Sequence, residues 1–128
     1  MDDQGLSIRE VAEQTGVSLH TLRYYERIGL LDPIERTTSG HRRFQSHDIR
    51  RIEFLKRLRA TGMPISKMQH YVELFRMGDR TAVERREMLV QHRQAVLSQI
   101  DALGETLQML ETKIDNYDRQ LATMEEEA

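Results

Sequence analysis

Apolar and polar residues alternate along this chain at helical spacing, first in two short segments near the N-terminus. Ser7 and Glu10 form a capping box, and apolar residues at Ile8, Val11 and Ala12 mark one face of the first predicted helix. The stretch Thr15-Gly16-Val17 interrupts this pattern, and Ser18 can cap a second helix whose apolar side carries Leu22, Tyr25 and Ile28. Two short helices joined by a turn that contains glycine predict a helix-turn-helix.

The helical period is lost between Pro33 and Gln45, where a Thr-Thr-Ser-Gly turn cluster predicts a β-hairpin, or wing. Helical spacing returns after Ser46, the expected N-cap, and this helix is expected to end at Gly62 as its C′ residue. A further helix is expected to open at Pro64. The apolar positions of these two helices are Ile49, Ile52, Leu55 and Leu58, then Ile65, Met68, Tyr71, Val72 and Phe75.

The C-terminal third of the chain predicts one long helix. Thr81 and Glu84 predict a second capping box, and no proline follows. Apolar residues then occupy heptad positions a and d. We expect the dimerisation residues to be Val96, Ile100, Leu103, Leu107, Leu110, Ile114, Tyr117 and Leu121. Because a rod of roughly 65–70 Å cannot be covered by a small domain, a partner helix must bury its seam, and the simplest partner is a second copy.

These elements predict a mainly α-helical protein with a winged helix-turn-helix and a long C-terminal dimerisation helix. We expect a DNA-binding domain over residues 1–76, a linker over 77–80 and a coiled-coil helix over 81–128. Residues 1–70 hold 12 Lys and Arg against 9 Asp and Glu, whereas residues 71–128 hold 7 against 12. This asymmetry favours the first part as the one that faces a polyanion.

The composition excludes several classes of function. The chain has no cysteine, which excludes disulfides and thiolate metal sites, and its histidines lack metal-ligand spacing. Neither paired carboxylates nor a nucleophile with its base stands out, so we expect no catalytic residues, no metal and no cofactor. Since no long apolar run or signal peptide is present, a cytoplasmic protein without a membrane partner is expected.

The ordered set of these segments resembles the MerR family of bacterial transcription regulators. The resemblance rests on Leu-Arg-Tyr-Tyr-Glu-Arg-Ile-Gly-Leu-Leu at 22–31, Gly-His-Arg-Arg-Phe at 40–44, Arg-Ile-Glu-Phe-Leu at 51–55 and the terminal heptads. Segments 73–75, 78–81 and 113–117 are similar to the family's aldehyde-responsive branch. That branch places a cysteine where this chain has Arg57, so thiol-based sensing is not expected.

The resemblance implies a homodimer held by an antiparallel coiled coil, with each winged domain on half of a palindromic promoter element. It implies that the dimer distorts an over-long promoter spacer and so acts on RNA polymerase indirectly, through the DNA. The resemblance also implies that the protein is bacterial and lies in the cytoplasm, associated with the nucleoid. The alternative that the residues leave open is a coiled-coil architectural or interaction protein whose DNA contacts are non-specific.

Residue by residue, the resemblance implies DNA contacts from the second helix and the wing. His20, Thr21 and Arg23 would lie at base edges or nearby phosphates, and Tyr24 and Tyr25 along the backbone. The ring of Tyr25 must also fill the core. The wing would contribute Arg36, Arg42 and Arg43, while Phe44 would pack beneath it.

The family's effector pockets lie near the junction of the fourth helix and the rod. In this chain that region contains Tyr71, Phe75 and Met77. A small apolar effector held there is one interpretation, and plain packing at the junction is the other.

Overall fold

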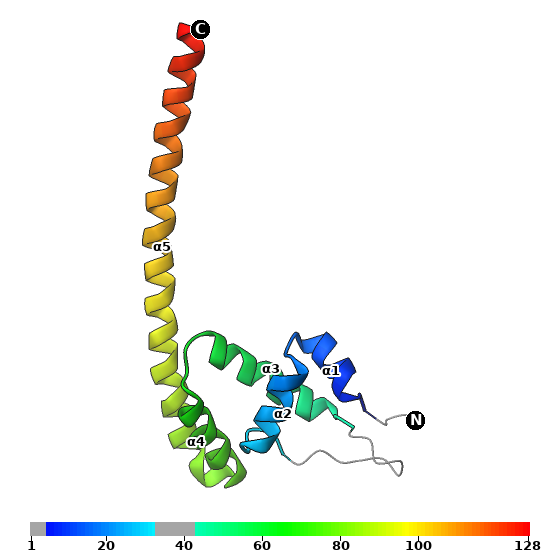
Figure 1. The fold of residues 1–128 in the computed structure, drawn as a ribbon. Coiled ribbons are helices and arrows are strands. Elements are labelled where there is room, and N and C mark those ends of the chain that lie inside the picture. Colours follow the sequence, from blue (N-terminus) through cyan, green and yellow to red (C-terminus); the bar gives the residue numbers. More distant parts are fainter. Residues whose placement is uncertain (1–4, 33–42) are drawn as a thin grey trace. The chain divides into compact units, whose positions relative to one another are not determined.

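A computed structural model describes residues 5–32 and 43–128. Its elements are α1 (Ile8–Thr15), α2 (Leu19–Arg27), α3 (Ser46–Ala60), α4 (Ile65–Arg76), a single 3₁₀ turn η1 (Asp79–Thr81) and α5 (Ala82–Glu127) (Figure 1). The described residues are therefore mainly helical, as the sequence predicts. The tip of the expected wing, with Arg36 and Arg42, lies outside the described residues.

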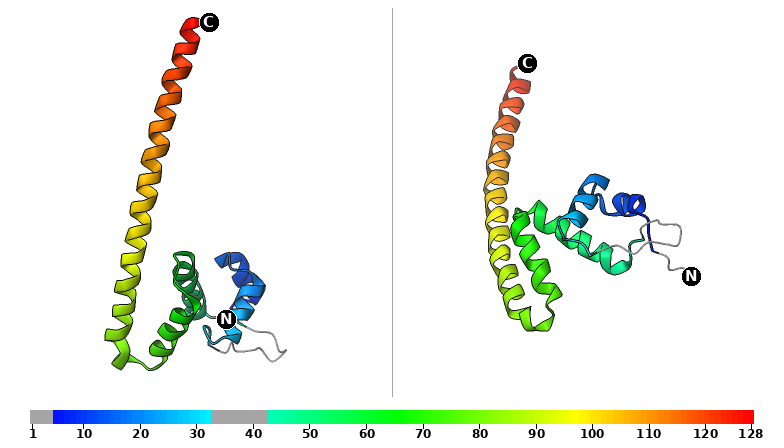
Figure 2. Two further views of the ribbon diagram at one scale, coloured as in Figure 1. Left: turned by 60° about the vertical axis from the view of Figure 1, so that its left-hand side comes forward. Right: turned by 60° about the horizontal axis from the view of Figure 1, so that its bottom comes forward.

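The helix-turn-helix forms where it was expected. Ser7 accepts the backbone N–H of Glu10 at 3.2 Å, and Glu10 accepts the backbone N–H of Ser7 at 2.8 Å, which completes the capping box of α1. Ser18 caps α2 by accepting the backbone N–H of Thr21 at 3.1 Å. Helix α1 packs against both α2 and α3 (Figure 2).

One core joins these helices to the described base of the wing. Leu6 and Phe44 form an isolated antiparallel bridge, with N–H to O distances of 2.7 and 2.9 Å. Phe44 is only 1% exposed and packs in the core, as expected. The other largest fully buried side chains are Val11, Thr15, Leu22, Leu30, Ile52, Leu55, Met68 and Val72.

The starts of the later helices differ from the sequence prediction. The N-cap of α3 is Gln45, whose backbone N–H is accepted by Asp48 at 2.8 Å, and Ser46 is already the first helical residue. Pro64 likewise lies one position before α4. The hydroxyl of Thr81, expected in a capping box, is buried, donates to the carbonyl of Leu74 at 2.5 Å and accepts a hydrogen bond from Nε of Arg85 at 3.0 Å. A capping-box pattern involves only neighbouring residues, so it cannot predict that the tertiary structure brings the carbonyl of Leu74 to this hydroxyl.

The chain divides into two compact units, Met1–Arg86 and Glu87–Ala128. The segment expected as a linker, residues 77–80, contains Gly78 with φ +87° and the beginning of η1. The second unit is a single uninterrupted stretch of α5 (Figure 2). No helix within the described residues is both long enough and apolar enough to cross a membrane.

Candidate nucleic-acid interface

The turn between α1 and α2 is fixed by contacts from three directions. Gly16 adopts φ +76°, a left-handed conformation that glycine accepts readily, and its N–H donates to Ala12 at 2.9 Å. The buried hydroxyl of Thr15 donates to the carbonyl of Val11 at 2.8 Å and accepts the N–H of Val17 at 3.2 Å. Lys56 of α3 donates to the carbonyl of Thr15 at 2.6 Å, which places a cation at the negative end of α1.

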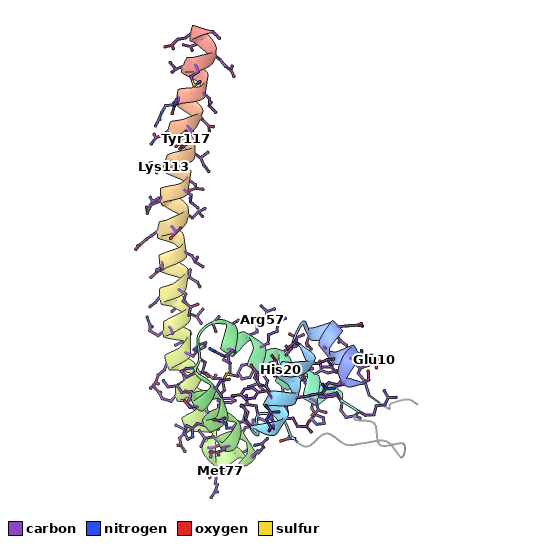
Figure 3. The ribbon with its side chains drawn as sticks, in the orientation of Figure 1. Glu10, His20, Arg57, Met77, Lys113 and Tyr117 are labelled. Atoms are coloured by element: carbon purple, nitrogen blue, oxygen red, sulfur yellow. The ribbon has the colours of Figure 1, made fainter. Side chains whose placement is uncertain are left out.

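Helix α2 divides cleanly into a buried and an exposed face. Leu22 and Tyr25 are 1% and 5% exposed, so they anchor the helix in the core. His20 and Arg23 are exposed, and Thr21 and Tyr24 are half-buried beside them. Figure 3 marks the position of His20 on this helix. Four of the five residues predicted to contact DNA from α2 are thus exposed or half-buried, whereas the fifth, Tyr25, is buried.

Aromatic and cationic groups lie together on this surface. The guanidinium of Arg27 lies 5.5 Å from the centre of the Tyr24 ring, and the rings of Tyr24 and Tyr25 are 6.2 Å apart. Burial raises the pKa of Tyr25, and the nearby Arg59 opposes this effect only in part. Tyr25 is therefore a protonated phenol at neutral pH. Its ring packs in the core, and only its hydroxyl is left to make a contact outside the core.

Arg43 is the predicted wing cation that the structure describes. Its guanidinium is 3.9 Å from the carboxylate of Glu10 on α1, and its Nε has no hydrogen-bond partner among the described residues. Hydrogen bonds from Ser7 lower the pKa of Glu10, and the charge of Arg43 adds to this effect. Arg43 therefore lies at the junction of the wing base and the capping box of α1 (Figure 3 labels Glu10).

Sequence reasoning missed the side chains that hold the segment after α2. Gln69 of α4 donates to the carbonyl of Ile28 at 3.1 Å, and Arg51 of α3 lies 3.5 Å from the carbonyl of Leu30. Arg76 donates twice to one carboxylate oxygen of Asp32, at 2.9 and 3.0 Å. The partners in these pairs are 21 to 44 residues apart in the sequence, so no local pattern could have linked them.

The three residues of the expected effector region have different surroundings. Tyr71 packs its ring 5.7 Å from that of Phe54, whereas Phe75 is 49% exposed and has the guanidinium groups of Arg51 and Arg85 near its ring. Met77 is also half-exposed and lies in the turn between α4 and η1 (Figure 3).

The predicted dimerisation seam is solvent-exposed along α5 in the single chain. Ile100, Leu103, Leu107, Leu110, Ile114, Tyr117 and Leu121 are each 54–69% exposed, and Val96 is intermediate. Figure 3 marks Tyr117 on this helix beside Lys113. These apolar residues recur at heptad spacing along α5 and stay exposed in the single chain.

Comparison with known families decides the assignment. Residues 6–74, just over half of the chain, match the family described as MerR HTH family regulatory protein. Residues 49–113 match the one described as MerR, DNA binding. The chain belongs to the MerR family.

Individual MerR relatives agree with this assignment. The chain is 42% identical over 92 residues to the HTH-type transcriptional regulator AdhR of Bacillus subtilis (strain 168), which covers 72% of the chain and 66% of AdhR. It is similar to the crystal structure of a chain described as a MerR family transcriptional regulator from Listeria monocytogenes. That likeness has 44% identity and a TM-score of 0.84, over 96% of this chain and 93% of the other.

A third MerR relative was solved on DNA. HiNmlR, described as a MerR family regulator lacking the sensor domain and bound to promoter DNA, is 33% identical with a TM-score of 0.80. The match covers 91% of this chain and 92% of that one. The chain is therefore a DNA-binding transcriptional regulator, and its relatives carry regulatory rather than enzymatic names.

Proposed function

We propose that this regulator binds a palindromic promoter element as a homodimer and controls transcription by distorting an over-long spacer. The observation that carries the proposal is the α2 surface, where Arg23, His20 and the aromatic group of Tyr24 lie exposed or half-exposed on a helix anchored by Leu22 and Tyr25. A helix held in this way can enter a major groove. The similarity to a regulator solved on promoter DNA supports the same use of this surface.

Each predicted contact has a role in the proposal. His20, Thr21 and Arg23 contact base edges or nearby phosphates. Arg23 suits this role because its planar guanidinium can bind a guanine edge or two phosphate oxygens. Tyr24 contacts the DNA backbone. Tyr25 can contribute only a hydrogen bond from its hydroxyl, because its ring is buried. Arg43, with Arg36 and Arg42 of the wing, supplies positive charge along the neighbouring phosphates.

The exposed stripe on α5 supports the proposed homodimer. Eight heptad side chains between Ile100 and Met124 are each at least 54% exposed, and a second copy offers a matching stripe for every one of them. Two winged domains joined through such helices suit an operator with two-fold symmetry, whose half-sites lie about one helical turn apart. Promoter distortion is then a property of the dimer on its DNA, and RNA polymerase responds to the altered spacer.

Binding measurements with the variant Arg23→Ala test the assignment of the DNA surface. DNA from upstream of the regulator's own gene serves as the specific probe, and a scrambled duplex of equal length serves as the competitor. We expect affinity for the specific probe to fall by about 5- to 150-fold, with base preference relaxed at one position in each half-site. The control is Arg119→Ala, which removes the same charge at a heptad f position of α5, outside the seam.

The same measurements separate the proposal from the architectural alternative. An equal loss of affinity on specific and scrambled DNA would give Arg23 only a phosphate role. A wild-type protein that binds both duplexes equally would contradict sequence-specific recognition and favour a non-specific architectural protein. The salt dependence reports the phosphate contacts independently, since each one contributes about 0.9 to the slope of log K against log salt.

A further inference from the structure

Two networks of side-chain contacts meet at one aromatic residue, Phe75. The first network holds the segment that leaves the recognition helix α2. In it, Arg51 of α3 reaches the carbonyl of Leu30, and its guanidinium also lies 4.8 Å from the centre of the Phe75 ring. A guanidinium within about 6 Å of a ring centre is attracted by the electrons of the ring face. Phe75 therefore helps to hold the side chain that supports the end of the recognition helix.

The second network holds the beginning of α5. Arg85 donates through Nε to the hydroxyl of Thr81 and through Nη2 to the carbonyl of Gly78, each at 3.0 Å. Its guanidinium also lies 5.4 Å from the centre of the same Phe75 ring. Thr81 in turn donates to Leu74 at the end of α4, so the turn between the two helices is tied on both sides.

Phe75 contributes little to the packing of the hydrophobic core, because 49% of its surface is exposed. Its neighbours on α4, Val72 and Leu74, are 1% and 6% exposed and supply the packing of that helix. The distinctive feature of Phe75 is its pair of cationic neighbours, which come from α3 and from the first turn of α5. This placement points to a role in holding two elements in a fixed relation.

We propose that Phe75 is a positioning residue for DNA binding, which couples the first turn of α5 to the exit of the recognition helix through Arg85 and Arg51. The inference rests on the proposed homodimer. In such a dimer the two recognition helices reach successive major grooves only if each is held firmly on the start of its own α5. Phe75 thus helps to determine which half-site spacing the dimer accepts, rather than how well one domain grips one half-site.

Binding to operators of altered spacing tests this role. We compare full operators whose half-site separation is natural, shortened or lengthened, together with a single half-site, for wild type, Phe75→Leu and Phe75→Tyr. For Phe75→Leu we expect affinity for the natural operator to fall by about 5- to 30-fold, the range that two exposed cation–π contacts correspond to. Its preference among spacings should flatten, and its affinity for the single half-site should stay unchanged. Phe75→Tyr keeps the ring and should behave as wild type.

Controls and a second variant keep the test decisive. Val83→Ala removes apolar surface that is 82% exposed in the same first turn of α5, and it should leave the spacing preference intact. Arg85→Lys keeps the charge but loses the planar fork, so it should flatten the preference as Phe75→Leu does, whereas the exposed Arg80→Lys should not. If Phe75→Leu does not fold, Arg85→Lys alone decides the outcome.

The results that would overturn the proposal differ from those that would overturn the dimer itself. A wild-type spacing preference in Phe75→Leu would show that the ring does not couple the two elements. An equal loss on the full operator and the single half-site would reduce Phe75 to a contributor to domain stability. If wild type itself shows no preference for two half-sites over one, the proposed dimeric function fails first.

Discussion

Replacing Leu107 by Asp should dissociate the proposed dimer. Leu107 is 55% exposed in the single chain, so pairing removes about half of a leucine surface from water, worth about 1 kcal/mol per chain. Two copies lose about 2 kcal/mol, and each carboxylate placed in the seam adds a desolvation penalty of about 1–3 kcal/mol. The sum is at least about 4 kcal/mol, or roughly a thousandfold in the dimer dissociation constant.

Sedimentation equilibrium over a range of protein concentrations measures this change directly. Thr112→Asp is the matched control, because it adds the same charge at an exposed heptad f position outside the seam and should leave the dissociation constant near that of wild type. The reasoning is refuted if the two variants dimerise equally well. It is also refuted if Leu107→Asp gives a folded monomer that binds the operator as tightly as wild type.

Three further predictions concern the DNA-binding domain. Lys56→Met removes the donor at the carbonyl of Thr15 and should lower the free energy of unfolding by about 1–2 kcal/mol in urea titrations; an unchanged midpoint would exclude a role in holding the turn. Phe44→Ala leaves a cavity at a site that is 1% exposed and should cost about 3–5 kcal/mol by thermal unfolding, and a loss below about 1 kcal/mol would contradict its place in the core. The lowered pKa of Glu10 means that its stabilising contribution is complete above its ordinary pKa and disappears as pH falls through the lower folded value. Acid titration of stability should therefore be shallower in Glu10→Gln than in wild type, and identical slopes would refute this.

Local signals predicted the fold well, because most elements here are specified by nearby residues. The Ser7–Glu10 box, the turn at Gly16 and the cap at Ser18 each depend on contacts within four positions, and all three form as expected. The heptads of α5 are equally local, and α5 runs from Ala82 to Glu127 without a break.

Tertiary partners account for what the sequence did not reveal. Thr81 fits a capping box by spacing, yet its hydroxyl bonds to Leu74, which only the fold brings near. Lys56 and Gln69 look like ordinary surface residues in the sequence, but each donates to a backbone carbonyl 41 positions away. The sequence therefore identified the surface of α2, but not the side chains that hold this helix in place.

In vitro transcription from the DNA upstream of the regulator's own gene tests the central claim most directly. Purified protein is added to one template with the natural spacer and to a second whose spacer is shortened towards the ordinary promoter length. The account predicts that the protein changes transcript level on the natural template and that this effect is lost or reversed when the spacer is shortened, because distortion acts through spacer length. An identical effect on both templates, or no effect on either, would contradict control by promoter distortion.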